Sequence, residues 1–199
     1  MKKLVVFVLA FSFLGVLGHA QILKRPGSGS VKTVQKVAVY DEGKGIFIPS
    51  GWMGDVGAIK VEPKCAEKPK KGKYCMKWTY DISKDAKNGW AGVYWQYPAN
   101  NWGTKSGLDL TGHKKLTLWA RGETGKEVIN IIAGGIKGQV PDSFIKELKG
   151  TKLSSEWKQY TIDLSGRDLS NVSGGFCWTA DSKLNKGAVT FYFDDILYE

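Results

Sequence analysis

The chain has 199 residues, a formal net charge of +10, a 42% share of hydrophobic residues and two histidines. This length suits one domain with a proper core and is short for two domains. His19 falls in a predicted leader segment, so His113 alone remains, which excludes metal sites and catalytic triads that need several imidazoles. No nucleic-acid-binding motif accompanies the scattered lysines. The charge therefore predicts a solvated basic loop at Lys64–Lys73 and no nucleic-acid partner, while an acidic polysaccharide or envelope surface stays open.

Residues 1–20 have the pattern of a secretory signal peptide. Two lysines precede an apolar run from Leu4 to Leu17, and small residues occupy the positions that signal peptidase reads before Ala20. The run is too short and wrongly flanked for a membrane span. We predict cleavage near Ala20 and a secreted or periplasmic protein. Residues 21–36, rich in Gly, Ser and Lys, are predicted to form a flexible lead-in to a single domain over residues 37–199.

Short runs of β-type residues, separated by turn signals, fill this domain. The predicted strands are Val37–Tyr40, Ala58–Glu62, Tyr74–Tyr80, Ala91–Tyr97, Lys115–Ala120, Val128–Ala133, Lys158–Leu164, Gly175–Thr179 and Val189–Tyr198. Helical periodicity is scarce, with at most a short turn near Ser143–Leu148. The pattern predicts an all-β fold, an antiparallel β-sandwich of the jelly-roll type, and a closed barrel is the alternative.

The three cysteines divide into a pair and a single residue. Cys65 and Cys75 flank the basic run, and in an oxidising compartment they predict a disulfide that closes a hairpin-like loop. A loop of about ten residues gains roughly 2–3 kcal/mol by the chain-entropy estimate. Cys177 is predicted to be a small buried residue, because only His113 is present to activate it as a nucleophile.

The segment from Trp90 to Trp102 is the most aromatic stretch of the chain. Strand alternation places Trp90, Tyr94 and Gln96 on one face and Val93 and Trp95 on the other, so both faces carry large rings. Two interpretations stay open. The strand is buried on both sides, or one face holds a sugar, whose apolar CH groups stack on the rings while polar side chains take its hydroxyls.

Other strands add residues to this expected face. Leu116, Leu118 and Ala120 read as core, which leaves Trp119 and Arg121 opposite them. A Gly-rich turn before Asp142 predicts a rim position for that carboxylate. The predicted sugar-binding set is Trp90, Tyr94, Gln96, Trp102, Trp119, Arg121 and Asp142. An exposed patch with this many aromatic residues indicates a bound ligand. The alternative to a ligand is that the loop over residues 97–107 folds back and covers the patch.

Several runs resemble a known family when they are taken in order and spacing. They are Pro-Ser-Gly-Trp-Met-Gly-Asp (49–55), Trp-Ala-Gly-Val-Tyr-Trp-Gln (90–96), Lys-Leu-Thr-Leu-Trp-Ala-Arg-Gly-Glu (115–123), Trp-Lys-Gln-Tyr-Thr-Ile-Asp-Leu-Ser (157–165) and Phe-Tyr-Phe-Asp-Asp-Ile (191–196). Together they are similar to secreted bacterial domains of the galactose-binding-like jelly-roll superfamily, close to carbohydrate-binding modules. The resemblance implies a noncatalytic sandwich that binds a polysaccharide or cell-envelope glycan on a concave sheet face or at the loop edge.

The resemblance also implies a structural calcium ion between the first strand region and the last strand. The matching carboxylates are Asp41, Glu42 and Asp194, which are hard oxygen ligands of the kind that calcium prefers. The alternative is that residues 41–45 form a polar turn and that Asp194 caps the backbone or pairs with a lysine.

Enzymatic activity and a structural role are the two alternatives to glycan binding. Glycoside hydrolysis needs two carboxylates on opposite sides of the scissile bond, and no spacing in this chain singles out such a pair. No nucleophile-elbow pattern surrounds Ser143 either. We therefore expect no enzyme, and polysaccharide lyase or hydrolase activity is the least favoured alternative. The other alternative is a structural subunit of a surface or periplasmic assembly, homomeric or heteromeric, in which protomers bury the aromatic face.

Overall fold

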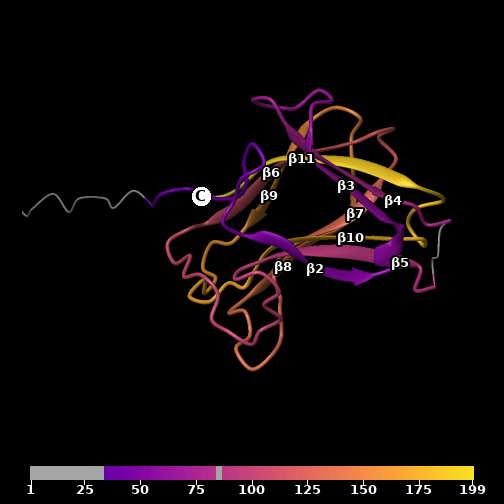
Figure 1. The fold of residues 1–199 in the computed structure, drawn as a ribbon. Helices are drawn as coiled ribbons and strands as arrows, with labels where there is room; N and C mark the ends of the chain where they lie inside the picture. The colour runs from indigo at the N-terminus through magenta and orange to yellow at the C-terminus, as the bar shows by residue number, and fades with distance from the viewer. Residues whose placement is uncertain (1–33, 84–86) are drawn as a thin grey trace, which may run out of the picture. The chain divides into compact units, whose positions relative to one another are not determined.

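Two antiparallel β-sheets, stacked as two layers, form the part of the chain that this computed structural model describes, residues 34–83 and 87–199 (Figure 1). The predicted signal peptide and most of the predicted lead-in lie outside the described residues. Within the described ranges, no helix has the length and apolar character that crossing a membrane requires. The predicted β-sandwich is confirmed. The barrel alternative is wrong, because β2, β3, β8 and β9 end the two sheets as unpaired edges.

The first sheet has six strands. They are β1 (Val37–Tyr40), β3 (Ile59–Cys65), β4 (Cys75–Tyr80), β6 (Lys115–Gly122), β9 (Lys158–Asp163) and β11 (Val189–Tyr198). The order is β3-β4-β11-β6-β9. The long strand β11 pairs with β4 along its first half and with β1 along its last three residues, so β1 continues the position of β4.

The second sheet has five strands. They are β2 (Ile48–Gly54), β5 (Trp90–Gln96), β7 (Val128–Gly134), β8 (Ile145–Lys152) and β10 (Gly174–Asp181), in the order β2-β5-β10-β7-β8. A short 3-10 turn, η1 (Val56–Ala58), follows β2. This sheet is the lower layer of Figure 1, and the loops over residues 97–107 and 135–144 extend beyond it.

A cluster of rings joins the two layers. The ring centre of Trp78 in the six-stranded sheet lies 5.3 Å from that of Trp95 and 5.2 Å from that of Trp178, both in the other sheet. The ring centres of Trp178 and Phe191 are 4.9 Å apart, and all three pairs meet edge to face. Such pairs contribute about 0.5–1.5 kcal/mol each beyond the burial of their area. Leu116, Leu118 and Ala120 of β6, which were predicted to point inward, all belong to this core. Alternation therefore identified the core-facing side of β6 correctly.

Two strands were not predicted from the sequence. The helical turn expected near Ser143–Leu148 is wrong, because Ile145–Lys152 forms β8 at the edge of the five-stranded sheet. Lysines are ordinary on an edge strand, where they discourage pairing with another chain, and here they obscure the strand pattern. The other missed strand is β2, which contains Pro49 and two glycines and shifts register between Pro49 and Gly51.

The predicted disulfide is wrong for this structure. Cys65 and Cys75 are register partners in neighbouring strands, yet both are free and buried. The Cys75 thiol points toward the carbonyl oxygens of Cys65, at 3.5 Å, and Glu67, at 3.8 Å. Burial raises the pKa of Cys75 to about 12, which keeps it a thiol. Cys177 is fully buried, as predicted.

Candidate functional site

The aromatic residues that were expected on one face lie on two different sheets. Trp90, Tyr94 and Gln96 belong to β5 of the five-stranded sheet, whereas Trp119 and Arg121 belong to β6 of the six-stranded sheet. All five point away from the core, but the outer faces of two stacked layers are directed oppositely. The expectation of one common face is therefore wrong. The physical reason is pairing, since β5 pairs with β2 and β10 and never with β6.

The basic loop over residues 66–74 covers part of the outer face of the six-stranded sheet, around Trp119 and Arg121. The Lys70 ammonium lies 4.1 Å from the centre of the Trp119 ring. The Arg121 guanidinium donates to the Glu67 carbonyl oxygen at 3.2 Å. The lysine side chains of this loop are exposed, as predicted, but its backbone packs across the sheet. A loop does cover part of the expected surface, although it is this one and not residues 97–107.

The outer face of the five-stranded sheet is open at Trp90. This indole is 38% exposed and begins β5. Tyr94 lies on the same face four residues later, about 13 Å along the strand. Between them, a side chain at Gly92 would approach the Thr179 methyl group to 2.7 Å and the terminal methyl group of Met53 to 3.3 Å. Met53 and Thr179 therefore line the strip between the two rings.

Polar side chains flank this aromatic line on the neighbouring strands. In the register of β10 with β5, Asp181 is opposite Trp90 and Thr179 is opposite Gly92. Asn130 of β7 is next in line, and its amide donates to the Thr179 hydroxyl at 2.9 Å. A depression of about 300 Å³ adjoins Trp90 and includes Thr179 and Asp181 among its walls. The face thus combines an exposed ring with hydroxyl, amide and carboxylate groups.

Trp102 occupies the other end of the same face. Its indole is 41% exposed and meets the Tyr94 ring edge to face, with 6.0 Å between the centroids. Tyr94 is buried beneath it and donates its hydroxyl to the Gly134 carbonyl oxygen at 3.2 Å. The exposed ring at this end is therefore Trp102, and Tyr94 supports it.

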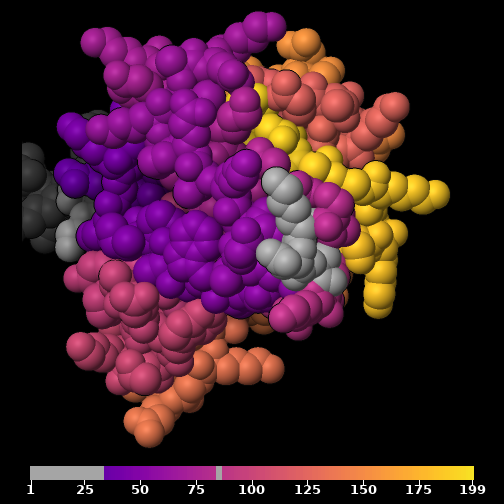
Figure 2. Space-filling model, turned by 45° about the vertical axis from the view of Figure 1, so that its right-hand side comes forward, coloured from indigo at the N-terminus to yellow at the C-terminus, as the bar shows by residue number. Residues whose placement is uncertain are grey.

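Two loops build the wall beside Trp102. They are the loop over residues 97–107 and the loop over residues 135–144, and they extend from the same side of the sheet (Figures 1 and 2). The Val140 amide donates to the Gly103 carbonyl oxygen at 2.8 Å, which ties one loop to the other. The two hydrogen-bonded loops thus hold Trp102 at the end of the sheet.

Gln96, which is buried, and Asp142, which is half-buried, stabilise these loops by hydrogen bonds. The buried Gln96 amide donates to the Asn101 carbonyl oxygen at 3.1 Å and accepts from the Ser50 hydroxyl at 2.9 Å. The Asp142 carboxylate accepts the amide N–H groups of residues 136, 173 and 174. Desolvation raises the pKa of Asp142 despite these hydrogen bonds. Direct sugar contacts from this pair are not supported, because their polar atoms already have backbone or side-chain partners.

Asp55 holds Trp90 in place, a role that its sequence context did not reveal. Its carboxylate accepts the Asn88 backbone and side-chain N–H groups and the Gly89 amide, each at 2.9 Å, and the Tyr80 hydroxyl at 3.1 Å. Desolvation opposes ionisation of Asp55, but the hydrogen bonds from Asn88, Tyr80 and Gly89 outweigh it and hold its pKa below the usual value. The turn that leads into β5 is therefore anchored directly before Trp90.

The carboxylates expected to bind calcium are engaged with the loop over residues 66–74. Asp194 accepts the Lys70 and Lys71 amides at 2.9 and 3.2 Å, and Glu42 accepts the Lys73 amide at 2.9 Å. Residues 34–83 and 87–199 contain no group of three or more His, Cys, Asp or Glu side chains placed to hold a metal ion. Calcium stays a prediction from the resemblance. A lower melting temperature after chelation would support it, and an unchanged melt without bound calcium would contradict it.

Comparisons with known proteins bear on the fold. No family model and no curated protein matches this chain. A family 30 carbohydrate-binding module matches with a TM-score of 0.59 and 12% identity, over 82% of this chain and 87% of the module. A family 11 module of a cellulosomal cellulase of Clostridium thermocellum matches with a TM-score of 0.54 and 16% identity, over 83% and 95% of the two chains. A family 11 module from Clostridium thermocellum in complex with a β-1,3-1,4-mixed-linked tetrasaccharide has a TM-score of 0.52 and 17% identity, over 83% and 96%.

These similarities define the class of protein as a jelly-roll β-sandwich with the fold of carbohydrate-binding modules. The resemblance inferred from the sequence is confirmed at this level. At 12 to 17% identity the comparison concerns the fold alone. The function has to be argued from the residues of the open face.

Proposed function

We propose that this protein binds a polysaccharide or cell-envelope glycan on the outer face of its five-stranded sheet, without catalysing a reaction on it. The observation that carries the proposal is the pair of exposed indoles, Trp90 and Trp102, which stand toward opposite ends of one sheet face. A large exposed aromatic surface is costly in water unless a ligand covers it. A pyranose ring covers it well, because its CH groups form an apolar face.

The polar residues beside the indoles supply the rest of the recognition. Asp181, Thr179 and Asn130 lie in register beside the aromatic line, where they can accept and donate hydrogen bonds to sugar hydroxyls. The length of the face, with the two indoles at separate ends, favours a run of several sugar units over a single one. The fold similarity to a module solved with a tetrasaccharide supports the same ligand class.

The arrangement of acidic groups supports binding without catalysis. Asp55 and Asp142 are saturated with hydrogen bonds from turns, and Asp181 accepts the amides of Lys183 and Leu184 at 2.9 Å. A hydrolase needs one carboxyl group that delivers a proton and a second on the other side of the bond. Asp55 and Asp142 therefore hold backbone, which is a structural use, whereas both amides bond Oδ1 of Asp181 and leave its Oδ2 for a sugar hydroxyl. The matched solved structures named above are binding modules, which agrees with this view.

Binding to a panel of polysaccharides tests the proposal. Native affinity electrophoresis in gels containing mixed-linkage β-glucan, xylan, glucomannan or alginate, and a pull-down with insoluble cellulose, should show retention by at least one of them. The double variant Trp90→Ala/Trp102→Ala should lose it. Trp52→Ala is the matched control, because Trp52 is 40% exposed but packs on Trp78 at the sandwich edge. No retention on any polysaccharide would contradict binding, and release of reducing ends would contradict its noncatalytic character.

Export of the protein is a second part of the proposal. The leader pattern over residues 1–20 implies that the mature chain begins near Gln21. N-terminal sequencing of protein recovered from the medium or periplasm of an expressing bacterium tests this. A chain that retains Met1 and stays in the cytosol would contradict it.

A further inference from the structure

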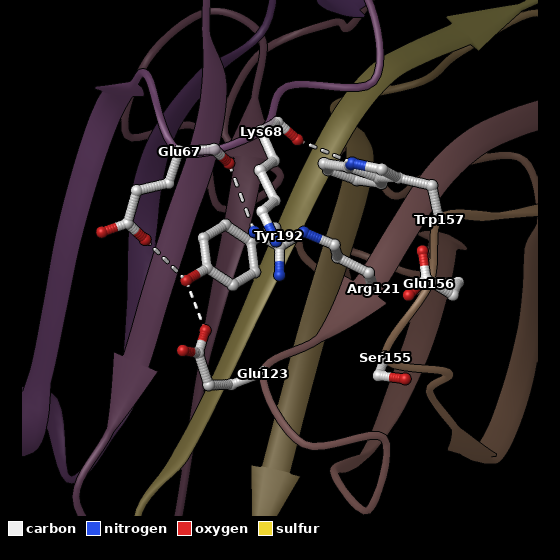
Figure 3. A pocket seen from close by; sticks show the side chains of 8 residues that line it. All are labelled: Glu67, Lys68, Arg121, Glu123, Ser155, Glu156, Trp157 and Tyr192. Atoms are coloured by element: carbon white, nitrogen blue, oxygen red, sulfur yellow. Dashed lines mark hydrogen bonds between the residues drawn. The ribbon is translucent and has the colours of Figure 1, made fainter.

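A second pocket lies on the outer face of the six-stranded sheet, on the side of the sandwich away from Trp90 and Trp102. Its volume is about 450 Å³. It is enclosed by the loop over residues 66–74, by β6 and β11, and by the segment over residues 155–157 that precedes β9 (Figure 3). None of its residues belongs to the glycan face proposed above.

A fixed guanidinium group forms the floor of this pocket. The guanidinium carbon of Arg121 lies 3.5 Å from the centre of the fully buried Tyr192 ring. One terminal nitrogen donates to the Glu67 carbonyl oxygen at 3.2 Å. The Arg121 Nε atom is buried and has no hydrogen-bond partner among the described residues. Stacking and one hydrogen bond thus hold the group in place, and that hydrogen bond uses one of the five N–H donors of the guanidinium.

Carboxylates stand beside the guanidinium. The Tyr192 hydroxyl contacts Glu67 at 2.9 Å and also Glu123, although it has a single hydrogen to donate (Figure 3). Lys77 lies 2.8 Å from Glu67, and the hydrogen bond from Lys77 is the main reason that the pKa of Glu67 is held below its usual value. The exposed Glu156 completes the acidic part of the wall.

An aromatic ring closes the rim. The Trp157 indole N–H donates to the Lys68 carbonyl oxygen at 2.8 Å, which fixes the ring (Figure 3). Its centre lies 5.5 Å from the Arg121 guanidinium carbon. The ring is half-buried, so part of it is available to a ligand. The pocket therefore has planar donors, carboxylate acceptors and an apolar edge within one small volume.

We propose that this pocket binds one neutral sugar residue, as a pyranose at a chain end or branch point. Two adjacent hydroxyls can each accept from the Arg121 guanidinium and donate to a carboxylate, a pattern that matches a planar donor group beside acceptors. The CH groups of the sugar meet Trp157. Glu123 and Glu156, which would accept sugar hydroxyls, would also repel a sugar carboxylate, and this favours a neutral sugar. A pocket of about 450 Å³ beside the loop over residues 66–74 fits a single sugar unit, whereas the face on the other sheet, with indoles at separate ends, fits a run.

The test follows the indole N–H signals of ¹⁵N-labelled protein by NMR during titration with methyl pyranosides. The probes are methyl glucoside, methyl mannoside, methyl galactoside and, as the acidic counterpart, methyl glucuronide. We expect at least one neutral glycoside to shift the Trp157 signal with saturation, and the glucuronide to bind at least tenfold more weakly. Trp157→Phe assigns the signal. No saturable shift with any neutral glycoside, or a preference for the glucuronide, would overturn the proposal.

Two variants that each replace one carboxylate by an uncharged amide locate the contact between the sugar and the pocket. Glu123→Gln and Glu156→Gln should each weaken the Trp157 response at least fivefold, and Glu156→Gln covers the case in which loss of the Tyr192 contact unfolds the first variant. Glu147→Gln is the control, since Glu147 is a glutamate of β8 on the other sheet, paired with Lys149. Unchanged affinity in Glu156→Gln and in a folded Glu123→Gln would refute the site. The double variant Trp90→Ala/Trp102→Ala should keep the Trp157 response, so that failure of the proposed main function is seen separately.

Discussion

Replacing Trp90 by alanine is expected to weaken glycan binding by about one order of magnitude and to leave the fold intact. Trp90 carries the most exposed ring of β5. The residue is 38% exposed, and only this part of its surface is available to a ligand. Removal of its exposed part subtracts from the contact with the sugar. The backbone of β5 stays paired with β2 and β10 on both sides, so the strand does not depend on this side chain.

The magnitude follows from the exposed area. A tryptophan side chain has on the order of 250 Å² of surface, so the exposed fraction of Trp90 amounts to about 95 Å². At about 25 cal/mol per Å², full coverage by a sugar contributes about 2.4 kcal/mol, and half coverage contributes about 1.2 kcal/mol. Since about 1.4 kcal/mol corresponds to a tenfold change, the Kd of the Trp90→Ala variant should rise about 7-fold to about 50-fold.

Isothermal titration calorimetry with an oligosaccharide of the retained polysaccharide measures this change. Trp90→Phe should keep part of the affinity, because a smaller ring still offers an apolar face. Trp52→Ala should bind as the wild type does, and thermal melts establish that each variant is folded. A Kd for Trp90→Ala within twofold of the wild type, or an equal loss in Trp52→Ala, would refute the assignment of the ligand to this face.

Three further perturbations test the supporting structure. Asp55→Ala should lower the melting temperature and weaken binding through Trp90. The pKa of Asp55 is lower in the folded than in the unfolded protein, where it is about 3.9. The ionised carboxylate therefore stabilises the fold above this pH, and the stabilisation is lost as the pH falls through the folded pKa. The difference in melting temperature between Asp55→Ala and the wild type should shrink below about pH 4. Asp142→Ala leaves three amide N–H groups without an acceptor and should cost about 2–4 kcal/mol in urea unfolding, and an unchanged midpoint would contradict its structural role. Lys70→Ala removes the ammonium above Trp119 and should cost about 0.5–1 kcal/mol in the same assay, whereas a stabilised protein would show that this contact is unfavourable.

The fold was predictable where a strand has one buried face. Leu116 and Leu118 alternate with polar or outward residues, and the same holds for the inward residues of β9 and β11, so period-two patterns gave both the strands and their core side. The pattern failed at β8, where Ile145–Lys152 is an exposed edge strand with little burial to impose alternation. It also failed at β2, because Pro49 and Gly51 carry no strand preference and the register shifts between them.

The site was predictable only within one strand. Alternation placed Trp90 and Tyr94 on the same face correctly, since that relation depends on the backbone alone. Which strand lies beside β5 depends on pairing over long sequence separations, and local pattern does not contain that information. β6 follows β5 in the sequence but belongs to the other sheet, so Trp119 was misplaced. Gln96 and Asp142 show a further limit, because a polar side chain in a loop serves the backbone as readily as a ligand.

The distribution of the tryptophans explains why one face of this sandwich is the better candidate for a polymer. Three tryptophans lie in the core, namely Trp78, Trp95 and Trp178. Trp119 and Trp157 lie on the outer face of the six-stranded sheet beside the loop over residues 66–74, and Trp52 closes the sandwich edge. Trp90 and Trp102 remain on the open face. The loop over residues 66–74 crosses the outer face of the six-stranded sheet, so Trp119 lies beside Lys70, and Trp157 lines a pocket at the loop. An extended ligand needs exposed rings spaced along one face, and Trp90 of β5 and Trp102 of the following loop provide two such rings toward opposite ends of the five-stranded sheet.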